Sequence, residues 1–127
     1  MKTMQSLMDG LSVTMQRERA KTQMTLGKMI NALEGMPEDA KVTNLHDPHS
    51  YRGYYCDLAF EQGNGFRPAN DLLVDCKEAM GRIFEGYKGG EFMMGESTPI
   101  WLVSHGSTGL KLIALHVGGK VETEKDD

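Results

Sequence analysis

The stretch YYCDLAFEQGNGFRPANDLLVDCKEAMGRIFEGY, residues 54–87, decides the fold that the sequence predicts. Residues 54–61 alternate apolar and polar side chains with the period of two that is typical of a strand. A polar turn is expected over residues 62–65, and a long helix over residues 68–87, where apolar residues recur at spacings of three and four. The strand residues that we expect to face the core are Tyr54, Cys56, Leu58 and Phe60.

Helix and strand patterns continue on both sides of this stretch. A helix is expected from Thr25, a plausible N-cap, to Gly35 and Pro37, with its apolar stripe at Leu26, Met29, Ile30 and Leu33. A short strand is expected over residues 41–45, followed by a polar turn at 46–50. The last third predicts strands over 100–105 and 110–117, joined as a hairpin by 106–109, and then an acidic, frayed tail at 121–127.

The resulting order is helix, strand, strand, helix, strand, strand. It predicts an α+β fold in which helices cover a small antiparallel or mixed sheet. An additional N-terminal amphipathic helix carries an apolar stripe at Met4, Leu7, Met8, Leu11 and Met15. Methionine adapts to irregular surfaces, so we expect this helix to pack in the core or against a second copy of the chain, as in a homo-oligomer. The expected divisions are an N-terminal helix (1–24), a single α+β domain (25–119) and an acidic tail (120–127).

Composition excludes several classes of function. The 127 residues suffice for one compact domain, and 14 Lys and Arg against 18 Asp and Glu give a formal charge of −4, which disfavours binding to a nucleic-acid polymer. No apolar run approaches the ~20 residues that span a bilayer, and the N-terminus lacks the apolar block of a secretion signal. We therefore expect a cytoplasmic protein without a membrane partner. Two cysteines are too few for a disulfide-stapled scaffold.

Two segments stand out as candidate ligand contacts. Ser50-Tyr51-Arg52-Gly53-Tyr54-Tyr55 combines aromatic rings with a forked cation, which suits stacking on a base and pairing with a phosphate. Glu85-Gly86-Tyr87-Lys88-Gly89-Gly90-Glu91-Phe92 combines a compact cation with glycines that allow close backbone approach. Structural roles, as an aromatic strand and a glycine-rich helix end, remain open for both. The candidate ligand-binding residues are Tyr51, Arg52, Tyr55, Arg67, Tyr87, Lys88, Gly89 and Gly90.

The sequence gives little support for catalysis or metal binding. Ser104 and His105 are neighbours on an expected strand, so their side chains point to opposite faces. Both cysteines, Cys56 and Cys76, fall on apolar faces and read as small core residues. His46 and His49 would need further ligands to hold a metal. We predict no catalytic residue, metal or cofactor.

The SYRGYY and GYKGGE segments, with the helix start Thr25-Leu26-Gly27, resemble small bacteriophage-encoded proteins that mostly lack an assigned function. The resemblance covers about residues 24–117. It implies expression in the cytoplasm of a bacterial host during infection. Small phage proteins commonly antagonise host systems, and one class sequesters nucleotide signals of bacterial immunity without cleaving them.

Three functions follow as expectations. The leading one is a non-catalytic protein that sequesters a small anionic ligand, such as a signalling nucleotide. Tyrosines would stack on it, while Arg52 and Lys88 would meet its phosphates. The second is a protein–protein inhibitor of a host enzyme, in which exposed tyrosines and the methionine-rich helix act as anchors. The third is a hydrolase or transferase that acts on a nucleotide.

Overall fold

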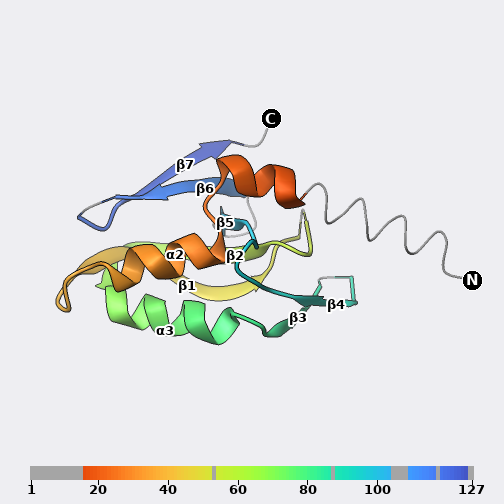
Figure 1. Ribbon diagram of the computed structural model, residues 1–127, viewed down its shortest axis with the longest axis horizontal. Helices are drawn as coiled ribbons and strands as arrows, with labels where there is room; N and C mark the ends of the chain where they lie inside the picture. Colours follow the sequence, from red (N-terminus) through yellow and green to blue (C-terminus); the bar gives the residue numbers. More distant parts are fainter. Residues whose placement is uncertain (1–15, 53, 87, 104–108, 117, 126–127) are drawn as a thin grey trace, which may run out of the picture.

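The structure is a computed structural model that describes residues 16–52, 54–86, 88–103, 109–116 and 118–125. A helical segment over residues 16–22 comes first. The elements that follow are α2 (Leu26–Glu34), β1 (Lys41–Ser50), β2 (Leu58–Pro68), α3 (Ala69–Ala79), β3 (Ile83–Glu85), β4 (Glu91–Met93), β5 (Ile100–Val103), β6 (Leu110–Leu115) and β7 (Val121–Lys125) (Figure 1). The protein is α+β, as predicted. The methionine stripe from Met4 to Met15 lies outside the described residues.

Five strands form one mixed sheet in the order β1-β2-β5-β6-β7. Strands β2 and β5 run parallel, and the other neighbouring pairs run antiparallel. The sequence predicted that the strands expected over 100–105 and 110–117 pair with each other. This pairing is confirmed between β5 and β6, where Trp101 lies opposite Lys111. Its connection, residues 104–108, lies outside the described part of the chain. Strands β3 and β4 form a separate hairpin.

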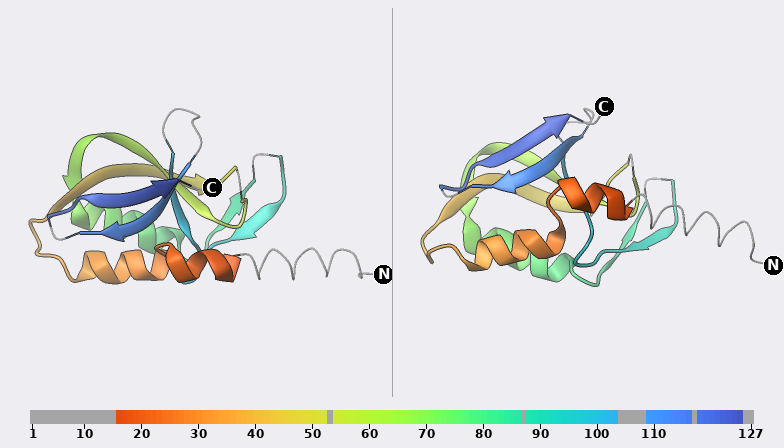
Figure 2. Two further views of the ribbon diagram at one scale, coloured as in Figure 1. Left: turned by 90° about the horizontal axis from the view of Figure 1, so that it is seen from above. Right: turned by 45° about the horizontal axis from the view of Figure 1, so that its top comes forward.

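Helices α2 and α3 lie side by side against the same face of the sheet (Figure 2). Thr25 caps α2 as predicted, because its hydroxyl accepts a hydrogen bond from the N–H of Lys28 at 3.3 Å. The apolar stripes of both helices face the sheet, where alternate strand residues meet them. This main core includes Leu26, Met29, Leu33, Leu72, Cys76, Leu58, Phe60, Ile100, Leu102 and Leu112.

The opposite face of the sheet carries a smaller aromatic cluster. Trp101 and Ala59 alternate with main-core residues along β5 and β2, so their side chains point to this second face. Tyr51 stacks on Trp101 with ring centroids 4.4 Å apart, and Tyr54 packs partly buried beside them. Both faces of the central strands are therefore buried. Tyr54, expected in the main core, belongs to this second cluster.

The sheet is curved, so that the turn between β6 and β7 at one edge contacts β1, the strand at the other edge. The backbone N–H of Thr43 donates to the carbonyl oxygen of Gly119 at 2.8 Å, and its hydroxyl donates to the same atom at 3.2 Å. Gly119 has a φ of 89°, and a Cβ there would collide with the carbonyl oxygen of Lys41. Glycine is needed at this position for both reasons.

Residues just before α2 complete the sheet. The N–H of Met24 donates to the carbonyl of Leu112 at 2.7 Å, and the N–H of Ile100 donates to the carbonyl of Met24 at 2.9 Å. The side-chain amide of buried Gln23 also donates to the carbonyl of Ile100, at 2.6 Å. Met24 thus lies between β5 and β6. The expected boundary between residues 24 and 25 does not separate two units within the described chain.

The long helix predicted over residues 68–87 is wrong beyond residue 79. Helix α3 ends at Ala79, and Gly81 then takes a φ of 77° and donates its N–H to the carbonyl of Met94 at 2.8 Å. Ile83 and Phe84 enter a strand instead, with Phe84 opposite Phe92. Two adjacent apolar residues are compatible with both a helical stripe and a strand. Pairing with β4 therefore determines that Ile83 and Phe84 form a strand.

Two predicted polar turns are strand residues. Residues 46–50 continue β1, and residues 62–65 continue β2 as far as Pro68. The register between the strands shifts from Thr43 to Leu45 and again from His46 to His49. These polar and glycine-rich residues therefore form bulges within a long ladder.

The acidic tail predicted at 120–127 is also wrong over Val121–Lys125, which forms β7. The strand pairs antiparallel with β6, and its acids face basic or small residues there: Glu124 lies opposite Lys111, and Glu122 lies opposite Ala114. Opposite charges across a ladder favour the pairing. Residues 126–127 lie outside the described chain.

Candidate functional site

The structure brings the two candidate segments together. Tyr55 lies in the turn before β2, and its ring packs edge-on against Phe92 of β4 with centroids 5.6 Å apart. A Cβ on buried Gly86 would lie 3.2 Å from Cδ2 of Tyr55. Residues more than thirty positions apart in the chain therefore form one surface. We call it the Tyr55–hairpin surface, and it comprises residues 51, 52, 54 and 55 and the described residues of the β3–β4 hairpin.

A tight glycine turn closes the hairpin. The N–H of Gly86 donates to the carbonyl of Gly90 at 3.0 Å, and the N–H of Gly89 donates to the carbonyl of Gly86 at 2.9 Å. Gly89 and Gly90 have φ values of 95° and 86°, which other residues rarely adopt. The sequence placed these glycines at a helix end. They instead form a turn between strands, and Tyr87 within it lies outside the described residues.

Charges of both signs lie on the Tyr55–hairpin surface. Arg52 and Lys88 are exposed, the latter in the turn itself. Glu85 and Glu91, also exposed, lie directly opposite each other at the last pair of the hairpin. The two cations would attract an anion at this surface, and the two carboxylates would repel it. Whether the net electrostatic energy favours binding therefore depends on where the anion places its charge.

Tyr51, a candidate for contact with a ligand, is largely enclosed by other residues. Its exposed fraction is 8%, and one ring face lies on Trp101. A Cβ on Gly109 would lie 2.5 Å from Cε1 of Tyr51, so the backbone at the start of β6 covers another side of the ring. In this conformation Tyr55 has the more accessible ring of the two.

Arg67 lies elsewhere. It directly precedes the helix expected over residues 68–87, but it belongs to β2 and pairs with Val42 at the start of β1. Its Nη1 donates to the carbonyl of Leu45 at 2.6 Å and to Asp75 of α3 at 2.9 Å. Residues 51–55 are at the other end of the β1–β2 ladder. Arg67 therefore fastens α3 to the sheet and is not part of the Tyr55–hairpin surface.

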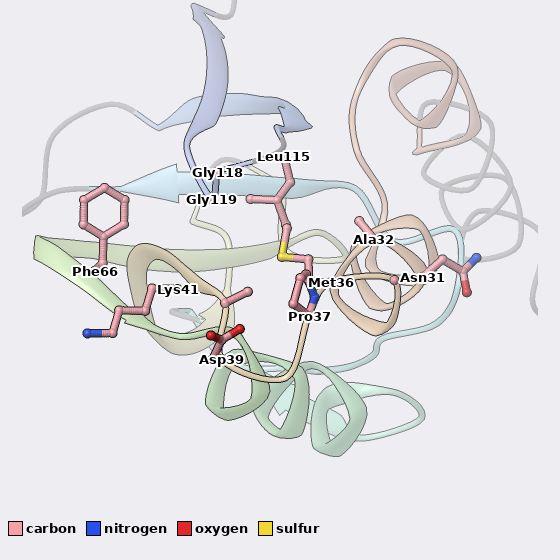
Figure 3. A pocket seen from close by; sticks show the side chains of 12 residues that line it. Asn31, Ala32, Met36, Pro37, Asp39, Lys41, Phe66, Leu115, Gly118 and Gly119 are labelled. Carbon is pink, nitrogen blue, oxygen red and sulfur yellow. The ribbon is translucent and has the colours of Figure 1, made fainter.

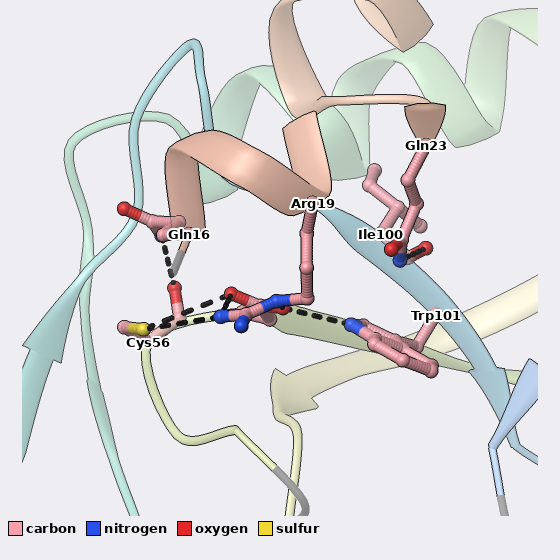
Figure 4. Close-up of polar contacts among 7 residues, drawn as sticks. Gln16, Arg19, Gln23, Cys56, Ile100 and Trp101 are labelled. Atoms are coloured by element: carbon pink, nitrogen blue, oxygen red, sulfur yellow. Dashed lines mark hydrogen bonds and ion pairs between the residues drawn. The ribbon is translucent and has the colours of Figure 1, made fainter. Parts of the chain in front are cut away.

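The sequence patterns do not predict the ion pair of Arg19 with buried Asp57, which lies beneath this surface (Figure 4). Asp57 has no exposed area, accepts two hydrogen bonds from Arg19 and a third from Nε1 of Trp101 at 2.8 Å. The guanidinium of Arg19 also lies 4.0 Å from the ring centroid of Tyr54. In the sequence Arg19 is one charge in a polar run. The donors Arg19 and Trp101 come from two segments far from Asp57 in the chain, so no local pattern indicates the pair.

Cys56 is half-buried in the turn before β2, beside the ion pair, and not on the core face of a strand. Burial raises the pKa of its thiol, and the adjacent Asp57 carboxylate raises it further, against the opposing effect of Arg19. The thiol therefore stays protonated at neutral pH and is a poor nucleophile. Cys76 is fully buried, as predicted, and burial raises its pKa to about 12.

The histidines that the structure describes have carboxylate partners. His49 Nε2 lies 2.8 Å from Glu61, and His46 Nδ1 lies 3.1 Å from Asp47. Among the described residues, no group of three or more His, Cys, Asp or Glu side chains is arranged to hold a metal. In the same part of the chain, no helix is both long and apolar enough to cross a bilayer.

Comparison of the chain with protein-family models, with curated proteins and with solved structures finds no match.

Proposed function

We propose that this protein is a non-catalytic binding protein that sequesters a small anionic ligand on the Tyr55–hairpin surface. The observation that carries the proposal is the contact of Tyr55 with Phe92, which unites the two segments that the sequence singled out. The proposed ligand is a signalling nucleotide of bacterial immunity, captured in the host cytoplasm by a phage-encoded, homo-oligomeric protein.

Different residues of the Tyr55–hairpin surface suit different parts of a nucleotide. The accessible ring of Tyr55 suits stacking on a base. The exposed cations Arg52 and Lys88 suit phosphate oxygens, with Arg52 able to donate two parallel hydrogen bonds. Gly89 and Gly90 carry no side chain, so a phosphate can approach the backbone of the turn closely.

Calorimetry with the full chain and a panel of cyclic and ADP-ribose-derived nucleotides tests this proposal. We expect Lys88→Ala to weaken binding about tenfold and Glu85→Gln to strengthen it, because they remove charges of opposite sign from the same hairpin. Lys120→Ala is the matched control, since it removes an exposed lysine beside Gly119, which contacts β1 at the end away from residues 51–55. Failure of every nucleotide to bind, or equal losses in Lys88→Ala and Lys120→Ala, would contradict the proposal.

The same complex separates binding from catalysis. Ligand released by heat denaturation and analysed by mass spectrometry should be recovered intact after long incubation. Recovery of a cleaved or transferred product would instead favour the hydrolase or transferase alternative.

A second candidate function, inhibition of a host enzyme through a protein–protein contact, is favoured by one observation on the hairpin. Ile83 and Met93 are cross-strand partners, and their exposed fractions are 51% and 64%. Paired exposed apolar side chains are typical anchors of an interface. If a host enzyme copurifies with the chain, the double variant Ile83→Ser, Met93→Ser should release it while nucleotide binding persists. Retention of the enzyme by this variant would rule out this contact.

A further inference from the structure

A cavity of about 770 Å³ opens at the end of the molecule away from residues 51–55 (Figure 3). It lies between the C-terminal end of α2, the start of β1 and the turn joining β6 to β7. Its volume falls within the range of about 300–1,000 Å³ that is typical of small-molecule sites. Most of its side chains are apolar, with Met36, Pro37, Phe66 and Leu115 the largest.

The closure of the sheet fixes one wall of this cavity. Gly118 and Gly119 line it, and the carbonyl of Gly119 is held by the two hydrogen bonds from Thr43. Lys41, against whose backbone Gly119 packs, lines the adjoining wall. The cavity is therefore bounded by hydrogen-bonded backbone and is largely formed before any ligand arrives, which lowers the entropy that binding costs.

Phe66 offers an apolar side chain that the protein leaves partly uncovered. Phe66 is 51% exposed although it lines the cavity from β2. In Figure 3 the ring stands on one side of the cavity, and Met36 and Leu115 point toward each other on the other. The apolar part of a ligand placed between Phe66 and Met36 would cover both the aromatic ring and the thioether. Both of these groups pack well against aromatic rings.

The charges at the cavity favour a cation. The C-terminal end of a helix carries a partial negative charge, and α2 has no basic residue in its last turn to compensate for it. Asn31, Ala32 and Gly35, at this end of α2, line the cavity, as does the exposed carboxylate of Asp39. Lys41 has the opposite charge, but in Figure 3 its ammonium group extends away from Met36 and Pro37.

We propose that this cavity binds a small amphipathic amine. Its apolar body would lie between Phe66, Met36 and Leu115, and its ammonium group would face Asp39 and the end of α2. This site is separate from the Tyr55–hairpin surface, because the ladder from Lys41 opposite Pro68 to Ser50 opposite Leu58 lies between them. The two surfaces take ligands of opposite charge.

Two probes that share one ring system test the proposal: 2-naphthylmethylammonium and 2-naphthylacetate, titrated into the full chain and followed by ¹H–¹⁵N NMR. We expect the cation to bind about tenfold more tightly than the anion, with shifts at Ala32, Leu115 and Gly118. Asp39→Asn should remove most of this preference and leave weak binding of both probes.

Phe66→Ala should weaken both probes about fivefold, since it removes the shared apolar contact. Val74→Ala is its control, because Val74 has a similar exposed fraction, 53%, on α3 and does not line the cavity. Equal binding of the two probes, no binding of either at millimolar concentration, or equal effects of Phe66→Ala and Val74→Ala would each overturn the proposal. None of these outcomes depends on whether nucleotides bind at the hairpin.

Discussion

Arg19 donates two hydrogen bonds to Asp57, from Nε at 2.6 Å and from Nη2 at 3.0 Å, across 38 positions of sequence. Burial lowers the pKa of Arg19, but the hydrogen bond and charge of Asp57 outweigh this effect and raise the pKa above its ordinary value. The pair fastens the helical segment 16–22 to the turn that carries Tyr55 (Figure 4). Because the carboxylate is fully buried, removing its partner is costly.

Replacement of this arginine should therefore destabilise the whole domain. We expect Arg19→Ala to lower the free energy of unfolding by about 3 kcal/mol, because it removes two hydrogen bonds from the buried Asp57 carboxylate. Among the described residues, Trp101 and the weak thiol of Cys56 then remain as its side-chain donors. Arg17→Ala, an exposed arginine two residues earlier, is the control and should change it by less than about 0.5 kcal/mol. Urea denaturation followed by tryptophan fluorescence measures both. Equal effects would mean that the pair does not form.

The two glycines of the β6–β7 turn should differ in their tolerance of a side chain. Gly118→Ala meets no atom within 4 Å and suffers only the strain of a φ of 101°, which costs about 1–2 kcal/mol. Gly119→Ala suffers a similar strain and also collides with Lys41, so we expect a further loss of about 2 kcal/mol or more. Thermal unfolding compares the two variants. A Gly119→Ala variant as stable as Gly118→Ala would show that the turn does not close onto β1.

Adjacent residues of β3 should differ in how strongly their truncation destabilises the fold. Phe84 is 6% exposed and Ile83 is 51% exposed, because neighbouring strand residues point to opposite faces. We expect Phe84→Ala to cost about 3 kcal/mol of unfolding free energy and Ile83→Ala to cost under about 1 kcal/mol. In the helix predicted from sequence, both side chains would lie on the apolar face and both variants would be strongly destabilised. Chemical denaturation distinguishes the strand from the helix.

The buried thiol of Cys76 should make the fold sensitive to alkali. Its pKa is raised to about 12 in the folded protein from 9.0, so the folded state holds a proton that the unfolded state releases above pH 9. This contribution to stability is complete below pH 9 and is lost as the pH rises toward 12, by about 1.4 kcal/mol per pH unit.

The measurement compares unfolding free energies of the natural chain and of Cys76→Ala between pH 8 and pH 11. Other groups titrate equally in both proteins, so the difference isolates Cys76. A difference that stays constant across this range would contradict the assignment of the thiol to the core.

Local patterns were sufficient for helix α2 and for the start of α3, but not for the end of α3. The stripe of α2, its Thr25 cap and its end at Gly35 follow from residues within one or two turns of each other. The alternation of Leu58 and Phe60 likewise predicted the core face of β2. The two segments of the candidate site also stood out by composition alone, since aromatic, cationic and glycine residues cluster there.

Contacts between segments decided the rest. The bulges of β1 and β2, the strand at Ile83–Glu85 and the strand at Val121–Lys125 depend on pairing with the neighbouring strand of a hairpin, which the polarity of a single segment does not encode. The same holds for the buried pair of Arg19 and Asp57 and for the cavity beside Phe66. The sequence by itself determined which segments are amphipathic and which are chemically unusual. Tertiary structure alone decided which of them meet, because side-chain burial and the hydrogen bonds of strands are satisfied between segments.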